Sequence, residues 1–275
     1  MTEGISPLVL ILSAILGGCM GSFLNVAAQR TVEGRPWWGR ERSVCDSCGH
    51  VLSAAELIPV FSWLLQRGRC RVCNAPVSVR YPLVELIAAA GALGLVWRWA
   101  GVSPWACALS LAGLAGVLLN ALTDWECGDV FDAFALATGV AGGLLRGFGG
   151  GGEALLDGAL GAAVGWGLFA FIILLTRGGM GWGDACFMGG VGAVLGWKFT
   201  LLAFYLGIMV GGVGVLFLIL CRRVRLGRGD SIPLVPYLAV GCYLTLLWGP
   251  EMLALLGVHF EAPGAFRPSW PFLRL

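Results

Sequence analysis

Charged residues are scarce in this chain. Only 12% of its 275 residues are Asp, Glu, Lys or Arg, and 58% are hydrophobic, whereas soluble domains carry roughly 25% charged residues. This shortage excludes an ordinary soluble fold. Together with a mean hydropathy of +0.84, it indicates a protein that lies in a lipid bilayer.

Histidine and lysine are scarcer still. With only two histidines, the chain has no convincing Ser–His–Asp triad. Seventeen of the eighteen basic residues are Arg, and membrane topology explains the Arg-rich loops better than nucleic-acid binding does. The glycine run 149–152 is not a phosphate-binding loop, because no Lys-Ser or Lys-Thr pair follows it. We therefore expect the lipid bilayer, and no nucleic acid, as a partner.

Apolar runs recur along the chain at lengths that suit membrane helices. A transmembrane helix needs roughly 20 mostly apolar residues, so the pattern predicts an all-α, polytopic membrane protein with about eight spans. The sixth span is short and rich in glycine, and the pattern leaves open whether it is separate from the seventh. The predicted spans are 6–28, 82–99, 104–123, 130–147, 154–176, 185–198, 200–221 and 232–257.

The basic residues predict the orientation of these spans. The segments that follow spans one, three, five and seven hold thirteen Lys or Arg residues, and the other connections and the C-terminal tail hold five. Cytoplasmic loops are the ones enriched in Lys and Arg, so we place the first group in the cytoplasm. The chain then divides into a first span (1–29), a cytoplasmic loop (30–81), a helical core (82–257) and an outer-face tail (258–275).

Four cysteines in the predicted cytoplasmic loop form two C-x-x-C pairs. Cys45 and Cys48 are separated by 21 residues from Cys70 and Cys73. Two such turns can aim four thiolates at one point, which is the pattern of a structural Zn²⁺ site. Gly49 and Asn74 follow the two pairs and suit turns with positive φ. The alternatives are four thiols without metal, or a redox dithiol.

Two aspartates end two of the predicted spans. Asp124 follows the third span, and Asp184 closes the run Gly181-Trp182-Gly183-Asp184 before the sixth. Both fall on the predicted cytoplasmic side. Carboxylates at a membrane boundary are costly and are usually retained for a function, so the two predict an aspartyl catalytic dyad. The alternative is that each is a helix cap or a solvated interfacial group.

Several motifs in one order resemble a known family. The chain is similar to bacterial prepilin peptidases, also called type IV leader peptidases, which are aspartic membrane proteases of the GxGD type. The resemblance covers nearly the whole chain. Its motifs are Gly21–Val26 with Arg30, Cys45-x-x-Cys48-Gly49-His50, Ile58–Trp63, Arg67–Cys73, Arg80–Glu85, Gly179–Asp184, and Ile232-Pro233 with Pro236–Ala239.

This resemblance implies a function. Asp124 and Asp184 match the catalytic aspartates, and Asp124 is preferred over Asp132. The helical core 82–257 becomes a protease core in the bacterial inner membrane, with its active site facing the cytoplasm. The implied substrates are prepilins or pseudopilins, whose leader is cut at the cytoplasmic face, typically after Gly. The resemblance also implies methylation of the new N-terminus with S-adenosylmethionine, and pilus or type II secretion assembly proteins as partners.

Several positions depart from the family pattern, among them Leu234-Val235 in place of a Phe-Gly pair. Phe131 stands where Pro is usual, and Cys186 stands where a Lys commonly follows the second aspartate. Two other functions therefore stay open: a proton-coupled membrane transporter, which predicts carboxylates near the middle of a span, and a catalytically silent scaffold of a pilus or secretion system.

Other polar residues have simpler interpretations. We expect His50 to be a surface or supporting residue, because four cysteines complete a zinc shell. Glu126 is interpreted as a loop charge, and Glu85 as a charge that favours a helix N-terminus. Asn25 and Gln29 either pair with polar groups between helices or line a cleft, and the sequence does not decide between these roles.

Overall fold

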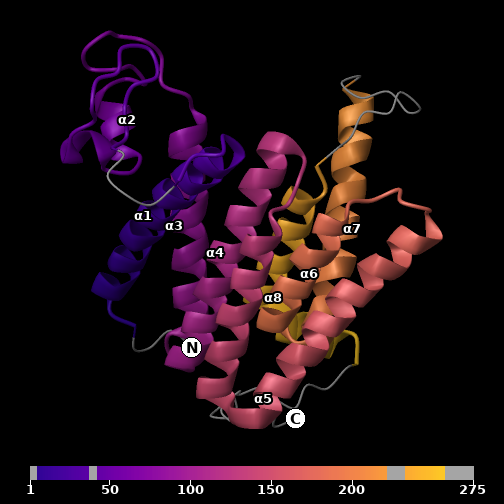
Figure 1. The fold of residues 1–275 in the computed structure, drawn as a ribbon. Helices are drawn as coiled ribbons and strands as arrows, with labels where there is room; N and C mark the ends of the chain where they lie inside the picture. The colour runs from indigo at the N-terminus through magenta and orange to yellow at the C-terminus, as the bar shows by residue number, and fades with distance from the viewer. Residues whose placement is uncertain (1–4, 37–41, 222–232, 258–275) are drawn as a thin grey trace.

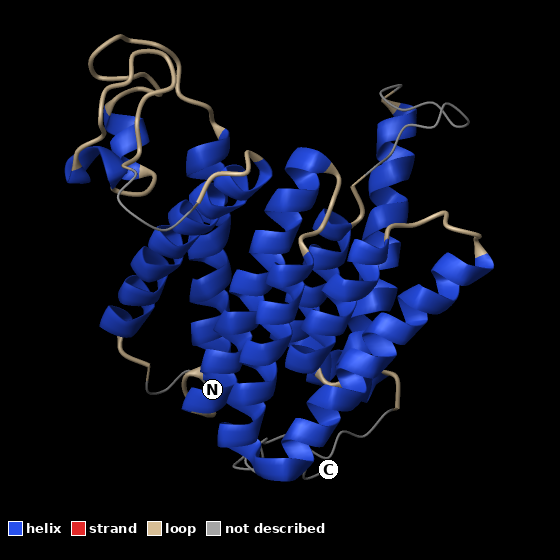
Figure 2. Cartoon of the chain, viewed as in Figure 1, coloured by secondary structure: helices blue, strands red, loops and turns tan. Residues whose placement is uncertain are grey.

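Apolar helices account for most of the described chain (Figures 1 and 2). The computed structural model describes residues 5–36, 42–221 and 233–257. These residues form eight α-helices and one short 3-10 helix, and their only strand pairing is two isolated bridges. The predicted all-α class is confirmed. The elements are α1 (Pro7–Val32), η1 (Ala54–Leu57), α2 (Phe61–Leu65), α3 (Arg80–Trp99), α4 (Pro104–Cys127), α5 (Asp132–Leu175), α6 (Trp182–Leu195), α7 (Trp197–Leu220) and α8 (Val235–Leu255).

Six of these helices are long and apolar enough to cross a membrane: α1, α3, α4, α5, α7 and α8. With 44 residues, α5 covers both predicted spans at 130–147 and 154–176. It is interrupted at Gly151, which has φ 68° and ψ −161°, and its two arms form a V (Figure 1). The 14-residue α6 is shorter than the six candidate spans. Gly196 separates it from α7, so the predicted sixth and seventh spans are separate helices.

Residues with known capping roles explain several helix ends. Ser6 and Ser103 each precede a proline and accept a hydrogen bond from a backbone N–H in the first turn of α1 and α4. Gly128 ends α4 with a φ of 69° and donates its N–H to the carbonyl oxygen of Asp124. The chain therefore turns sharply just after Asp124.

Helix α6 lies between the two arms of α5. Gly190 faces Ala135 on the first arm, and Gly192 faces Gly161 on the second. A Cβ atom at Gly190 or Gly192 would collide with the backbone of the facing helix. Only glycine permits so close an approach, and this packing holds α6 between the two arms.

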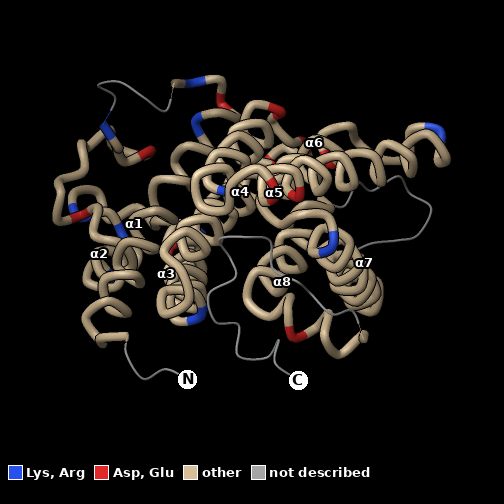
Figure 3. Tube along the Cα trace, turned by 90° about the horizontal axis from the view of Figure 1, so that it is seen from below, with Lys and Arg blue, Asp and Glu red and all other residues tan. Residues whose placement is uncertain are grey.

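One end of the bundle gathers the segments that carry the candidate sites. The ends of α1, α4 and α7 and the starts of α3, α6 and α8 all lie at the upper end in Figure 1, together with residues 33–36 and 42–79, which we call the cysteine loop. Most of the remaining trace carries no charged residue (Figure 3). The predicted tail 258–275 lies outside the described residues.

At the opposite end, a buried arginine joins three helical segments. Arg146 on the first arm of α5 is only 5% exposed. It donates to the carbonyl oxygen of Val194 at the end of α6, at 3.0 and 3.1 Å, and to that of Ala154 on the second arm, at 3.2 Å. Its Nη1 also forms an ion pair with Asp157, at 2.8 Å. No motif or spacing in the sequence predicts this role.

Replacing Arg146 with Met should destabilise the protein. The change leaves the half-buried Asp157 carboxylate, whose side chain is 20% exposed, without its ion-pair partner. Breaking a fully buried ion pair costs about 3–5 kcal/mol, which sets the upper end of the expected loss. Thermal unfolding in detergent micelles measures the effect. The double variant Arg146→Met with Asp157→Asn is the control and should recover part of the loss. A single variant as stable as the unaltered protein would contradict the prediction.

Candidate active site and metal centre

Asp124 lies in the last turn of α4 and is 4% exposed. Its Oδ2 accepts a hydrogen bond from the backbone N–H of Val235, at 2.9 Å. Val235 is the first residue of α8, where backbone N–H groups lack partners within the helix. Asp124 therefore caps α8. A helix cap is one of the structural roles that the sequence left open for this residue.

Asp184 lies in the first turn of α6 and is half-buried. The preceding residue, Gly183, packs against Val130, which follows α4 by three residues. The Asp184 carboxylate interacts electrostatically with those of Asp124 and Asp129. The structure thus brings the two predicted aspartates together at one end of the bundle, whereas Asp132 is exposed at the start of α5.

Two helix N-termini surround this pair of carboxylates. Asp184 belongs to the first turn of α6, and Asp124 binds the first N–H of α8. The N-terminus of a helix carries a partial positive charge that favours anions. At Cys186, where the family pattern has a lysine, the chain supplies no cation. The backbone of α6 and α8 therefore provides positive charge beside the two aspartates.

The four predicted metal ligands form one cluster. The Sγ atoms of Cys45, Cys48, Cys70 and Cys73 all lie within 4.8 Å of one another. Each C-x-x-C turn is closed by a backbone hydrogen bond, from Gly49 to Cys45 and from Asn74 to Cys70. Gly49 has a φ of 70° and Asn74 one of 58°, as the sequence predicted. His50 is not part of the cluster.

The pKa values of two thiols in the cluster shift in opposite directions. Backbone N–H groups of Cys73 and Val72 lower the pKa of Cys70 to about 6, so this thiol is largely a thiolate at neutral pH. The backbone at His50 favours the Cys48 thiolate, yet desolvation and the three other thiols raise the pKa of Cys48 to about 12. A bound cation would favour the thiolate form of every member, since the thiolate is the form that binds metal.

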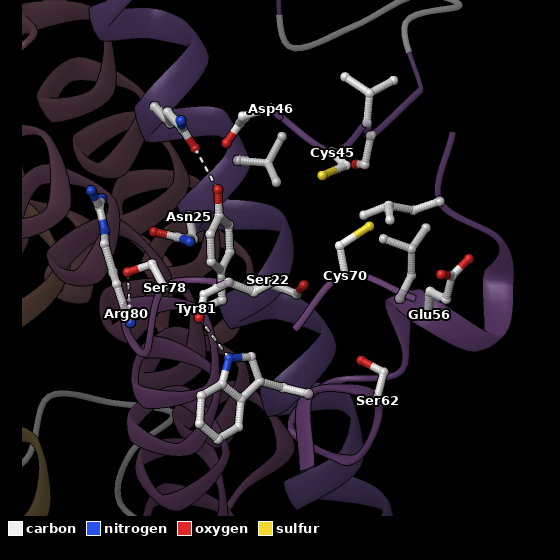
Figure 4. A pocket seen from close by; sticks show the side chains of 18 of the residues that line it. Ser22, Asn25, Cys45, Asp46, Glu56, Ser62, Cys70, Ser78, Arg80 and Tyr81 are labelled. Atoms are coloured by element: carbon white, nitrogen blue, oxygen red, sulfur yellow. Dashed lines mark hydrogen bonds between the residues drawn. The ribbon is translucent and has the colours of Figure 1, made fainter. Parts of the chain in front are cut away.

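A cavity of about 490 Å³ lies between the cysteine loop, the C-terminal end of α1 and the N-terminal end of α3 (Figure 4). Asn25 and Gln29 both line it, so they face a cleft. Several buried polar atoms on its wall have no hydrogen-bond partner in the described chain: Oδ1 of Asn25, Oε1 of Glu56, and Nε and Nη2 of Arg80. Unpaired buried polar atoms are costly, so a polar ligand or ordered water beside them would be favoured.

Glu56 is an ionised carboxylate on this cavity wall. Its Oε2 accepts hydrogen bonds from the backbone and the hydroxyl of Ser53, at 2.9 and 2.8 Å. These bonds, the backbone one foremost, lower the pKa of Glu56 to about 2. His50 lies 3.3 Å from the same carboxylate, so its side chain contacts Glu56 rather than completing the cysteine cluster.

Two glutamates depart from their sequence interpretations. Glu126 is not a loop charge, because it belongs to the last turn of α4 and forms an ion pair with Arg80 at the start of α3. Glu85 does not act on the N-terminus of its own helix. Its Oε2 accepts the backbone N–H of Val60 in the cysteine loop, at 2.6 Å. Both contacts join segments far apart in sequence, so no local pattern predicts them.

Comparisons with known proteins cover both halves of the chain. Residues 15–99 match the bacterial peptidase A24 N-terminal domain, and residues 111–216 match the type IV leader peptidase family. No solved structure matches significantly.

Curated relatives named prepilin leader peptidase/N-methyltransferase match over most of the chain. The protein of Stutzerimonas stutzeri is 33% identical, covering 90% of this chain and 94% of its own length. That of Pseudomonas putida is 34% identical, covering 88% and 92%. That of Aeromonas hydrophila is 33% identical, covering 77% and 73%. The chain therefore belongs to the prepilin leader peptidase/N-methyltransferase family.

Proposed function

We propose that this protein removes the leader of prepilins or pseudopilins and that Asp124 and Asp184 carry out the cleavage. One observation supports these residues above all others. The two carboxylates lie at the same end of the bundle, within electrostatic range of each other, although 60 residues separate them in sequence. Nearby carboxylates titrate as a unit, with one holding a proton while the other is charged.

The paired carboxylates suit peptide hydrolysis. The charged member takes a proton from water, which then attacks the peptide carbonyl carbon. The protonated member donates a hydrogen bond to the carbonyl oxygen and supports its developing negative charge. The proton taken from water then passes to the leaving nitrogen as the carbon–nitrogen bond breaks. No metal ion takes part in this scheme, which agrees with a four-cysteine cluster that would leave no open position on its metal.

We place the cleavage at the cytoplasmic face of the inner membrane. The sequence assigns the segments after α1, α4 and α7 to the cytoplasm from their arginines, and these helices end where the aspartates lie. The two arms of α5 and the short α6 then cross the bilayer as separate spans, which gives eight crossings. Pilus or type II secretion assembly proteins remain the proposed partners on this side.

For methylation we propose S-adenosylmethionine as the donor, bound in the cavity beside the cysteine loop. This molecule carries a positive sulfonium, an ammonium and a carboxylate. The unpaired oxygens of Glu56 and Asn25 suit its cationic groups, and the unpaired nitrogens of Arg80 suit its carboxylate. When bound, it supplies the methyl group that the new N-terminal amine takes up.

For the cysteine cluster we propose a structural Zn²⁺ ion. Four thiolates at tetrahedral positions leave no site open for a substrate. The metal would fix the two C-x-x-C turns of a loop that has few buried apolar residues of its own.

Replacing Asp124 or Asp184 with Asn should abolish leader removal. Each change removes the group that transfers or shares the proton, so the rate should fall by about 100-fold or more. Cleavage of a prepilin peptide by the purified protein in detergent, followed by mass spectrometry, measures the rate. Asp132→Asn is the matched control and should stay within about threefold of the unaltered protein. Full activity in either of the first two variants would refute the assignment.

Replacing Cys45 or Cys70 with Ser should lower the bound metal. The unaltered protein should hold about one zinc per chain, because four thiolates complete one shell. Plasma mass spectrometry of the purified protein measures this content. Cys19→Ser, which changes an exposed cysteine on α1, should leave it unchanged. Equal zinc in all four proteins would mean that the cluster is not the site.

Replacing Asn25 with Leu should weaken the binding of S-adenosylmethionine. Leucine has nearly the same shape but cannot accept a hydrogen bond, so the affinity should fall by about tenfold. Isothermal titration calorimetry measures it. Asn120→Leu is the matched control, because Asn120 is also fully buried with an unpaired Oδ1 but lies outside the cavity. If both variants bind like the unaltered protein, the donor binds elsewhere.

A further inference from the structure

The last turn of α4 presents two carboxylates to two different neighbours. Residues two positions apart on an α-helix point about 200° apart, so Asp124 and Glu126 face nearly opposite directions. Asp124 meets the start of α8 through Val235. Glu126, with a side chain only 12% exposed, meets Arg80 at the start of α3. The end of α4 therefore stands between the paired aspartates and the cavity beside the cysteine loop.

Arg80 connects that cavity to α4. Every residue that lines the cavity lies between Ser22 and Glu85, and Arg80 is one of them. In Figure 4 it stands across the cavity from Cys45 and Cys70. Its Nη1 forms the ion pair with Glu126, whereas its Nε and Nη2 are buried without a partner in the described chain. One guanidinium thus lies on the cavity wall and also pairs with the helix that carries Asp124.

The chemistry of the product explains what a carboxylate at this place can do. Leader removal creates a new α-amine, whose ordinary pKa of about 7.7–8.0 makes it mostly an ammonium at neutral pH. An ammonium is attracted by a carboxylate and by the negative C-terminal end of a helix. Glu126 offers both, because α4 ends one residue later, at Cys127.

We propose that Glu126 receives the new N-terminal ammonium and presents it to the methyl-donor cavity, with Arg80 holding Glu126 in place. Glu126 is then a positioning residue that transfers the product from the peptidase site to the methylation site around the end of α4. The amine releases one proton to water and forms a bond to the donor's methyl carbon with its lone pair. The carbon–sulfur bond breaks and leaves its electrons on sulfur. This inference rests on the proposed cavity and aspartate pair.

Peptide binding tests Glu126 without any methyl donor. The probe is the mature pilin peptide, with either a free or an acetylated N-terminus, and its affinity is measured by fluorescence anisotropy. Glu126→Gln should weaken binding of the free peptide by about tenfold, the size expected for losing one charge-assisted hydrogen bond. Binding of the acetylated peptide should not change, because acetylation removes the positive charge. The matched control is Glu251→Gln, which removes a glutamate paired with Arg98 at the other end of α3 and should alter neither affinity.

Three further measurements separate this inference from the proposed function. In Glu126→Gln, leader cleavage and S-adenosylmethionine binding should stay within about threefold, while the KM for methylating the free peptide rises by about tenfold. Glu126→Asp keeps the charge but shortens the side chain. It should weaken the binding of the free peptide only, and by a smaller factor than Glu126→Gln. Equal losses for free and acetylated peptides, or no loss with the free peptide in either variant, would overturn the role of Glu126. Failure of the unaltered protein to cleave or to bind the donor would instead overturn the proposed function.

Discussion

Two carboxylates held close together in an apolar bundle repel each other and lose hydration, so the fold has to supply compensating charge. Here the compensation comes from the backbone. Asp184 lies in the first turn of α6, and Asp124 binds the first N–H of α8, so the positive ends of two helices meet at the pair. A helix dipole cannot lose its charge by deprotonation, unlike the lysine that the family pattern places at position 186. The placement of α6 between the arms of α5 therefore brings both Asp184 and the positive end of its helix to the pair.

Asp124 has a structural role and a proposed chemical role at once. As the sequence allowed, it caps a helix, but the helix it caps is α8 rather than its own. That bond fixes one oxygen of the carboxylate and leaves the other for a second partner. The positions of both aspartates also bear on the transporter alternative, which predicts carboxylates near the middle of a span. Both lie instead in the terminal turns of their helices.

Features that depend on local pattern could be predicted from the sequence, and features that depend on packing could not. Apolar runs gave the helices, and the C-x-x-C spacing gave the cysteine cluster with its positive φ at Gly49 and Asn74. Counting the predicted spans also placed Asp124 and Asp184 on the same side of the membrane. By contrast, the contacts of Arg146 with α6 and of Glu126 with Arg80 join residues 46 to 48 positions apart. A single charged residue looks the same in sequence whether it meets solvent or a partner, so the sequence predicts a loop charge at Glu126 where the structure has an ion pair.

The cysteine loop and the helical core depend on each other at Glu85. Val60 in the loop has a φ of 63°, which strains a β-branched residue by roughly 1–3 kcal/mol. Such a conformation persists only where neighbouring contacts enforce it. The short bond from the Val60 N–H to the buried Glu85 carboxylate does so, and Pro59 beside it packs at Gly18 on α1. Because the cavity wall consists of α1, α3 and this loop, a zinc ion in the loop and a carboxylate in the core would jointly set the cavity's shape. The metal can then matter for methylation while lying outside the chemistry of cleavage.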